Sequence, residues 1–440
     1  MDFVVTALRG LFGLAALIGI ATLLSSDRKR IPWRVVGMGV LLQFTFALLV
    51  LKTAPGNALF AWIGSGFQKL LAFTYAGTGL LFGPLGTPTG DQSMGVIFAF
   101  QILPTIIFFG SLMAVLYHLK LVQPVVRVIG MFMAKVMRLS GAESLAMAAN
   151  IFVGQTEAPL VVKPYVESMT RSELFALMVG GMATIAGGVM AAYIAFLGGG
   201  DPVREAEFAK HLLSASIMNA PAALLLAKVM IPETSKPLTQ GGAKVAEEKL
   251  SENTIEAAAG GASEGLMLAL NVGAMLLAFV ALIAMINAAL GWVGAPTLAG
   301  TAPLYDLNTW IVSVTDGQFD GLTLQSIFGV LLAPIAWLVG VDNQDLLLFG
   351  SLLGQKVAVN EFVAYLGLVN VQGEMTERSV ILATYALCGF GNFSSIAIQI
   401  GGLGGIAPSR RGEIAELGIR AVIAGTLATC MSATMAGILL

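Results

Sequence analysis

Charged residues are scarce in this chain. Asp, Glu, Lys and Arg together make up 11% of its 440 residues, whereas 57% of the residues are hydrophobic. A soluble domain carries roughly 25% charged residues, so a chain with less than half that proportion cannot cover a folded surface with polar groups. Long apolar runs broken by short polar ones recur from end to end. The sequence therefore predicts an all-α integral membrane protein.

Cysteine, histidine and net charge are equally limited, and each shortage excludes a class of protein. The two cysteines, Cys388 and Cys430, lie in apolar stretches and indicate no disulfide framework. A formal charge of −2 argues against nucleic acid as a partner. The two histidines, His118 and His211, lie at predicted span ends, where we interpret them as interfacial residues rather than metal ligands.

Apolar runs long enough to cross a bilayer occur eight times. A helix needs about 20 mostly apolar residues for this purpose. The runs are Phe3–Leu24, Trp33–Leu51, Val96–His118, Glu173–Leu197, Leu212–Ile231, Gly265–Val293, Val380–Leu403 and Gly418–Leu440. An even number puts both termini on one side of the membrane.

The distribution of Lys and Arg decides which side that is. With both termini outside the cytoplasm, most of the 24 Lys and Arg residues fall on the cytoplasmic side. The outer loop from Gly294 to Ser326 then carries three aspartates and no basic residue. The basic cluster Arg28–Arg30 follows the first run, whereas a secretory signal carries its positive charge before the run. We therefore predict a retained first helix and both termini outside.

Three further stretches do not fit a simple span. Residues Ala54–Thr87 mix isolated aromatics with glycines, which is typical of a helix that lies at the interface or packs against neighbours. Leu119–Pro164 and Phe328–Leu368 each hold two shorter apolar pieces that meet at a polar centre, which predicts two re-entrant hairpins. Pro232–Glu256 lacks apolar periodicity and predicts a polar cytoplasmic linker between two halves. This organisation is similar to the inverted repeats of secondary transporters.

The first polar centre contains Asn150, Gln155 and Glu157, with apolar residues on both sides. A carboxylate with two amides is costly in lipid, so we expect the cluster to face a cavity or a partner. An ordinary solvated loop is the alternative. The next run contains Gly187 and Gly188, which permit unwinding and would free carbonyl oxygens for a ligand, although close helix packing explains the same glycines.

The second polar centre contains Glu361, and the run after it holds Asn392 and Ser395. Lys356 offers a different explanation as the partner of Glu361 in a structural ion pair, but such a buried pair stabilises poorly without further hydrogen bonds. Neither centre contains an arginine, the natural bidentate partner of phosphate or dicarboxylate. We therefore expect a polar, uncharged ligand rich in hydroxyl and amide groups.

Three strings carry a family resemblance: GQTEAP at Gly154–Pro159, VNEF at Val359–Phe362 and CGFGNFSSI at Cys388–Ile396. They resemble the signature of the concentrative nucleoside transporters, in the bacterial branch that lacks the extra amino-terminal helices of animal members. The similarity covers essentially the whole chain. It implies a sodium-coupled importer of uridine-like nucleosides in a bacterial cytoplasmic (inner) membrane, with sodium as coupling ion and no other cofactor.

The resemblance also implies an architecture. Family members are homotrimers in which a mobile transport domain carries the site past a fixed scaffold, an elevator-type form of alternating access in contact with membrane lipid. We accordingly expect scaffold helices and an interfacial helix in residues 1–118, the first half of the transport domain in 119–231, the cytoplasmic linker in 232–264, a scaffold helix and outer loop in 265–325, and the second half of the transport domain in 326–440.

By motif, the resemblance implies eight substrate-binding residues. Those for the nucleobase are Gln155, Thr156 and Glu157, with Val189 packed nearby, and those for the ribose are Glu361, Asn392 and Ser395, with Phe390 lining the pocket. A carboxylate can accept hydrogen bonds from both vicinal hydroxyls of a ribose.

The family's sodium site implies four ligand residues: the side chains of Asn150 and Thr184, and the backbone carbonyls of Val153 and Ile185. A hard cation prefers oxygen ligands, and unwound backbone supplies them. Thr184 stands where members often have Ser, and the hydroxyl is kept. Proton-coupled relatives lack the Asn, so Asn150 favours sodium.

Other functions remain as alternatives to this prediction: a proton-coupled nucleoside transporter, a membrane-embedded enzyme, or a channel for a neutral polar solute. An enzyme using Glu157 and Glu361 would need a metal or nucleophile nearby, and both histidines lie far from the two polar centres. Two re-entrant tips that close on one site suit occlusion better than an open pore. We therefore predict a transporter and not an enzyme.

Overall fold

The computed structural model describes residues 3–88, 96–240, 242–243, 251–296 and 303–440. Its regular structure is entirely helical, with no β-strand in these ranges, which confirms the predicted all-α class. Parts of two predicted segments lie outside the described residues: 241 and 244–250 of the linker, and 297–302 of the outer loop.

Seven helical segments in the described part of the chain are long and apolar enough to span a membrane. They are Val4–Leu23, Trp33–Lys52, Phe98–His118, Arg171–Gly198, Pro202–Met230, Thr254–Gly294 and Pro408–Leu439. The remaining predicted run, Val380–Leu403, is divided into α16 (Glu377–Leu387) and α17 (Phe393–Ile406) by the non-helical residues 388–392. The fourth run is likewise divided into α8 (Arg171–Ala183) and α9 (Gly187–Gly198). Two of the eight predicted spans are therefore broken helices.

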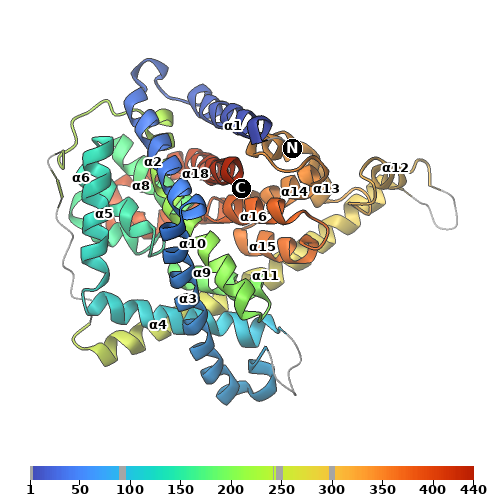
Figure 1. Cartoon of the computed structure of the whole chain (residues 1–440), viewed down its shortest axis with the longest axis horizontal. Helices are drawn as coiled ribbons and strands as arrows, with labels where there is room; N and C mark the ends of the chain where they lie inside the picture. The colour runs from blue at the N-terminus through green and yellow to red at the C-terminus, as the bar shows by residue number, and fades with distance from the viewer. Residues whose placement is uncertain (1–2, 89–95, 241, 244–250, 297–302) are drawn as a thin grey trace.

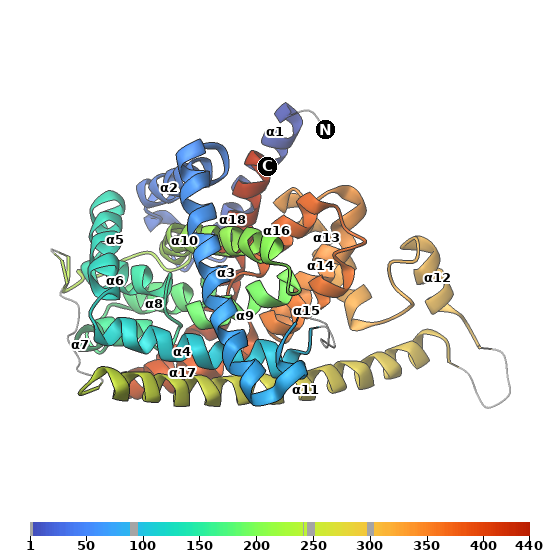
Figure 2. The same ribbon diagram turned by 60° about the horizontal axis from the view of Figure 1, so that its bottom comes forward.

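The two chain ends lie on one side of the molecule (Figures 1 and 2). α1 (Phe3–Leu23) packs against α18 (Arg411–Leu439), and a Cβ atom on Gly10 would lie 2.2 Å from Cγ1 of Ile438. The start of the first helix therefore contacts the end of the last one. The predicted even number of spans would put both ends on the same side of the membrane, and that placement stays a prediction.

Helices α2 (Trp33–Lys52) and α3 (Ala54–Phe82) follow, and both pack along α10 (Pro202–Met230). α3 corresponds to the predicted interfacial stretch. It begins at Thr53, whose side chain accepts a hydrogen bond from the Gly56 backbone N–H, and it runs without interruption for 29 residues.

The first half contains α5 (Val122–Met137), α6 (Gly141–Asn150), a polar tip, a short second arm formed by a 3-10 turn (Ala158–Val162) and α7 (Lys163–Val166), then α8, α9 and α10. Local sequence sets these boundaries. Arg138 ends α5 in the left-handed region at φ 57°, and the capping box of Ser140 and Glu143 starts α6. A second capping box, Thr170 with Glu173, starts α8.

The second half repeats this order of elements: α13 (Leu324–Val339), α14 (Leu346–Ala358), a polar tip, α15 (Glu361–Val371), then α16, α17 and α18. In each half the hairpin proper begins after a separate helix, α5 or α13, which packs on its first arm. The hairpin tips therefore lie where the two polar centres were predicted.

Helices α4 (Leu103–His118) and α11 (Thr254–Gly294) pack along each other. Glycines bring their backbones together, because a Cβ atom on Gly261 would lie 2.6 Å from the carbonyl oxygen of Gly110. Figure 2 shows α11 along one edge of the molecule, extending toward α12 (Leu307–Val314). Only 11% of the most apolar stretch of α11 is buried, so a long apolar face is uncovered.

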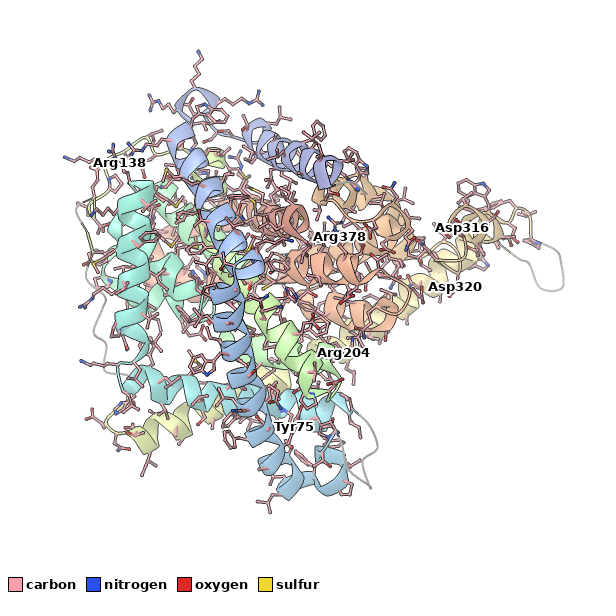
Figure 3. All side chains as sticks on the ribbon, viewed as in Figure 1. Tyr75, Arg138, Arg204, Asp316, Asp320 and Arg378 are labelled. Carbon is pink, nitrogen blue, oxygen red and sulfur yellow. The ribbon has the colours of Figure 1, made fainter. Side chains whose placement is uncertain are left out.

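Some charged side chains lie at the periphery, whereas others, such as Lys356 and Glu361, are buried. In Figure 3, Arg138 lies at one edge of the molecule, whereas Asp316 and Asp320 lie at the opposite edge beside α12. The interior between these edges holds the two broken helices and the two hairpin tips.

Candidate functional site

The two broken helices cross at their interruptions. The backbone N–H of Phe390 donates to the carbonyl oxygen of Thr184 at 3.3 Å, which joins the second break to the first. A Cβ atom on Gly389 would lie 2.8 Å from the carbonyl oxygen of Ala183. Glycine is therefore required at position 389, because any side chain there would push the two backbones apart.

Asn219 of α10 joins the same two breaks from the side. Its Nδ2 donates to the carbonyl oxygens of Ala183 at 2.8 Å and Cys388 at 2.7 Å. These carbonyls lie where α8 and α16 end, so their usual intrahelical partners are missing. The sequence analysis did not identify Asn219. The available signal in the sequence was an asparagine inside a predicted apolar span, and in the structure its side chain is fully buried.

The second hairpin tip places Glu361 at the crossing. Asn360 caps α15, so Glu361 is the first residue of that helix, and it is 4% exposed. One carboxylate oxygen accepts from the Tyr193 hydroxyl at 3.0 Å, and the other accepts from Nδ2 of Asn392 at 2.7 Å. Each oxygen keeps a lone pair for a further donor.

The first hairpin tip reaches the same place from the other half. Nε2 of Gln155 donates to Oγ of Ser395 at 3.1 Å, and the Ser395 backbone N–H donates to Oδ1 of Asn392 at 2.8 Å. A continuous hydrogen-bonded chain therefore runs from Gln155 through Ser395 and Asn392 to Glu361. It links both tips through the second break.

The other predicted substrate residues surround this chain. Thr156 and Glu157 are exposed at the first tip, and Glu157 lies against Gly154, whose added Cβ atom would be 2.5 Å from Oε2 of Glu157. Val189 is buried on α9, four residues before Tyr193 and so on the same helical face. Phe390 is half-buried within the second break.

Lys356 does not pair with Glu361. Within the described residues its ammonium group donates instead to the carbonyl oxygen of Ala386 at 2.8 Å and to Oγ1 of Thr429 at 2.9 Å. It is fully buried and satisfies a carbonyl in the last turn of α16. The carboxylate of Glu361 is therefore left to neutral donors.

The residues expected to bind sodium meet at the first tip and the first break. Asn150 ends α6, and its Oδ1 is buried without a hydrogen-bond partner among the described groups. The Thr184 hydroxyl donates to the Gly180 carbonyl oxygen at 2.8 Å, which leaves its lone pairs free. A Cβ atom on Gly180 would lie 3.2 Å from Nδ2 of Asn150, so the two segments are adjacent.

The backbone at this point also suits a hard cation. Residues 184–186 are non-helical, and Ile185 is fully buried. Val153 lies in the irregular segment that follows α6. An unpartnered amide oxygen, a hydroxyl and unwound carbonyls are the donor set that an oxygen-preferring cation requires, so the residues present fit sodium.

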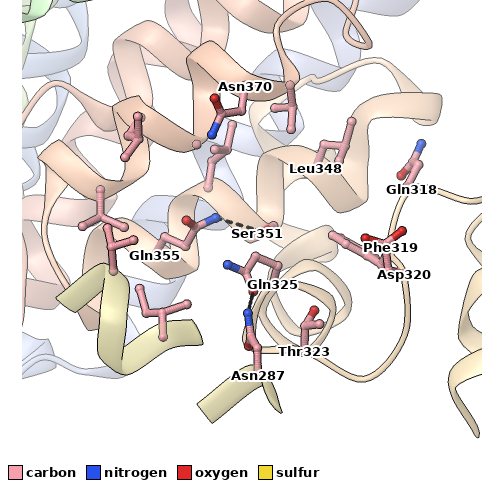
Figure 4. A pocket seen from close by; sticks show the side chains of 17 residues that line it. Asn287, Gln318, Phe319, Asp320, Thr323, Gln325, Leu348, Ser351, Gln355 and Asn370 are labelled. Atoms are coloured by element: carbon pink, nitrogen blue, oxygen red, sulfur yellow. Dashed lines mark hydrogen bonds between the residues drawn. The ribbon is translucent and has the colours of Figure 1, made fainter. Parts of the chain in front are cut away.

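A cavity of about 380 Å³ lies away from this centre, between α11 and the outer flank of the second hairpin. Figure 4 shows its polar lining, which includes Asn287 on α11, Gln325 on α13, and Ser351 and Gln355 on α14. Nδ2 of Asn287 donates to Oε1 of Gln325 at 2.8 Å, and this bond ties α11 to the start of α13. Polar and apolar side chains therefore share the lining of the space between the hairpin and the facing part of α11.

Comparisons with known proteins agree with these features. Three family models match this chain. Residues 211–437 match the model described as Na+ dependent nucleoside transporter C-terminus, and residues 12–85 match the model of the corresponding N-terminus. Residues 99–200 match a model described as nucleoside recognition. An uncharacterized transporter of Bacillus subtilis, YutK, is 46% identical over 97% of this chain and 98% of its own length.

A mammalian relative and a solved structure extend this similarity. Solute carrier family 28 member 3 of Rattus norvegicus is 42% identical over 97% of this chain, which spans 58% of that longer protein. The structure of CNTnw in an inward-facing substrate-bound state has a TM-score of 0.86 at 42% identity and covers 99% of this chain and 98% of its own.

Proposed function

Because this chain belongs to the Na+ dependent nucleoside transporter family, we propose that it is a symporter that imports a nucleoside together with sodium across a bacterial cytoplasmic membrane. The family is one of transporters and not of enzymes. The observation that carries the proposal is the hydrogen-bonded chain from Gln155 to Glu361, which brings polar groups of both hairpins to one buried centre.

The chemistry of that centre suits a nucleoside. In our proposal Glu361 accepts hydrogen bonds from ribose hydroxyls. Asn392 and Ser395 hold the carboxylate and the sugar in position relative to each other. Tyr193 and Asn392 each donate to one carboxylate oxygen, so the carboxylate is fixed in orientation but still has lone pairs facing the ligand.

The nucleobase in this proposal lies against the first tip. Gln155, Thr156 and Glu157 supply polar contacts, and Val189 and Phe390 supply apolar surface on either side of the ring. The exposure of Thr156 and Glu157 supports this role, because polar side chains at the tip are accessible while the ribose-binding end is closed.

Sodium in this proposal is held by the Asn150 and Thr184 side chains and by the carbonyls of Val153 and Ile185. When bound, it supplies a positive charge that draws these oxygens together. Asn150 ends the first arm of the hairpin, and Thr184 opens the first break, so groups that share one cation would tie the tip to the broken helix. This would order Gln155, which lies five residues after Asn150.

We further propose elevator-type movement, with the division between scaffold and transport domain at residues 118, 231, 264 and 325 as expected from the sequence. The cavity between α11 and the second hairpin supports this view, since it leaves these two surfaces incompletely packed against each other. The uncovered apolar face of α11 supports a homotrimer surrounded by lipid.

Counterflow in proteoliposomes tests the proposed function. Vesicles loaded with unlabelled uridine should accumulate external labelled uridine, and an inward sodium gradient alone should drive uptake into empty vesicles. A proton gradient should not replace sodium. Uptake that ignores sodium and follows protons would instead identify a proton-coupled carrier, and equilibration without counterflow would identify a channel.

A further inference from the structure

Gln399 lies on α17 and makes two hydrogen bonds with one amide nitrogen. Its Nε2 donates to the backbone oxygen of Met178 at 2.9 Å and to Oε1 of Gln155 at 3.2 Å. Gln399 is 2% exposed, so both bonds form away from solvent. It therefore connects the polar residue at the first tip to the backbone of α8.

These two bonds fix the orientation of both amides. A backbone carbonyl can only accept a hydrogen bond, so Met178 determines that Gln399 turns its NH2 group, and not its oxygen, toward α8. The second N–H of the same group then meets Gln155, which must present Oε1. Nε2 of Gln155 consequently points the other way, to Oγ of Ser395 at 3.1 Å.

Gln155 and Ser395 each keep a donor at this end of the site. Gln155 has one N–H beyond the one that Ser395 accepts, and its oxygen, with one lone pair engaged, faces Gln399. Ser395 uses its hydroxyl oxygen as the acceptor for Gln155, so its own O–H remains available to donate. A ligand that reaches these two residues therefore meets N–H and O–H groups.

We propose that Gln399 is a positioning residue that holds Gln155 as a hydrogen-bond donor. The site then prefers nucleosides with a carbonyl oxygen at the base edge facing Gln155 over those with an amino group there. This inference rests on the proposed function, in which Gln155 contacts the nucleobase.

Close packing fixes where the pair lies. A Cβ atom on Gly181 of α8 would lie 2.7 Å from Cβ of Gln155 and 2.9 Å from Nε2 of Gln399. The α8 backbone therefore contacts both side chains directly. The two hydrogen bonds, and not this packing, determine which end of each amide faces its partner.

The test compares ligands that differ at one base edge, where a carbonyl and the adjacent ring N–H are replaced by an amino group and an unprotonated ring nitrogen. Dissociation constants are measured in detergent with saturating sodium for uridine and cytidine, and for inosine and adenosine, because each pair exchanges a carbonyl for an amino group. The parent protein should bind the carbonyl member of at least one pair more tightly. Gln399→Met keeps the side-chain volume but removes both donors, so the preference should fall by about fivefold as Gln155 becomes free to turn.

A second variant should move the preference further. A protonated carboxyl group in Gln399→Glu can donate to the Met178 oxygen and present its carbonyl oxygen to Gln155. Gln155 would then turn its NH2 group toward residue 399 and offer Oε1 to the ligand. The ligand preference should therefore shift toward cytidine or adenosine by more than it does in Gln399→Met. A purely structural role for Gln399 would weaken both members of a pair equally.

Gln43→Met is the matched control. Gln43 of α2 is fully buried, and its Nε2 donates to the Met218 oxygen at 3.2 Å and to Oγ of Ser432 at 3.0 Å, away from the site. The parent preference should be kept in this variant. If Gln399→Met fails to fold, the ligand preference of Gln399→Glu tests the proposal by itself.

An unchanged preference in the Gln399 variants overturns the inference, and so does a parent that binds nucleosides without distinguishing either pair. Either result leaves the proposed function standing, because nucleosides still bind. A parent protein that binds no nucleoside overturns the proposed function, and the inference with it.

Discussion

At the scale of single residues, the site depends on neutral hydrogen-bond donors around one carboxylate. Glu361 is held by Tyr193 and Asn392, whereas Lys356 is engaged with Ala386 and Thr429. A carboxylate without an ion pair keeps stronger acceptor capacity for a ligand than one neutralised by lysine.

The first prediction is that Glu361→Gln lowers uridine affinity by roughly 2 kcal/mol, about 30-fold, because one neutral acceptor and a donor replace two charged acceptors. Removing ribose hydroxyls from the ligand should weaken binding to the parent and matter much less in the variant. Binding of uridine and deoxyuridine to both proteins measures this double-mutant cycle.

Glu205→Gln serves as the control, since Glu205 is also a buried carboxylate but lies on α10 beside Tyr75, away from both tips. It should leave the uridine-to-deoxyuridine difference intact. If deoxyuridine binds more weakly than uridine by the same factor in the parent and in Glu361→Gln, Glu361 does not bind the ribose hydroxyls.

The second prediction concerns sodium. Asn150→Ala should raise the sodium concentration needed for half-maximal uridine uptake, because one of a few hard oxygen ligands is lost. Asn271→Ala, on the exposed surface of α11, should leave it unchanged. Uptake assayed over a range of sodium concentrations distinguishes the two, and an identical sodium response in Asn150→Ala and the parent would contradict the ion assignment.

Sequence reasoning could find the residues whose types are unusual in an apolar run. Glu361, Asn392, Gln155 and Ser395 were predicted in this way and by motif, and they form one chain in the structure. Tyr193 was not found, because a tyrosine in an apolar span has no distinctive pattern. Its role depends on a contact with Glu361 across 168 residues of sequence.

At the scale of elements, the two broken helices are stabilised by each other. Their interruptions were predicted only in part: Gly187 and Gly188 beside the first break were interpreted as permitting unwinding, but Val380–Leu403 was read as one span. Length and hydropathy cannot reveal such a break, because Asn392 acts as the N-cap of a new helix, α17, inside the apolar run.

The third prediction tests that crossing. Gly389→Ala should destabilise the protein by about 1–3 kcal/mol and reduce transport, because the new Cβ atom would press on the Ala183 carbonyl. Gly401→Ala in α17 is the matched control, since a Cβ atom there meets nothing within 4 Å. Thermal unfolding in detergent and uridine uptake compare the two, and equal stability of both variants would show that the backbones are not in close contact.

At the scale of the whole molecule, the packing of α1 against α18 brings both termini to the same end of the molecule. The basic residues of the sequence predict that this end faces away from the cytoplasm. The division into scaffold and transport domains likewise stays a prediction, because it concerns movement between states.

The fourth prediction is the orientation. An enzymatic reporter fused after Leu440 should be active outside the cytoplasm, and one inserted near Gly242 should be active inside. The insertion site belongs to the polar segment between α10 and α11. Cytoplasmic activity of the Leu440 fusion would mean that the spans run in the opposite direction.

The hydrogen bonds of the site residues also couple the two hairpins mechanically. Gln155 of the first tip is bonded to Ser395, and Glu361 of the second tip is bonded to Asn392, which caps the helix that carries Ser395. A shift of either tip relative to the second break would therefore strain hydrogen bonds made by the other tip as well. The two tips and the second break form one mechanical unit, so a local displacement at one tip is felt at the other.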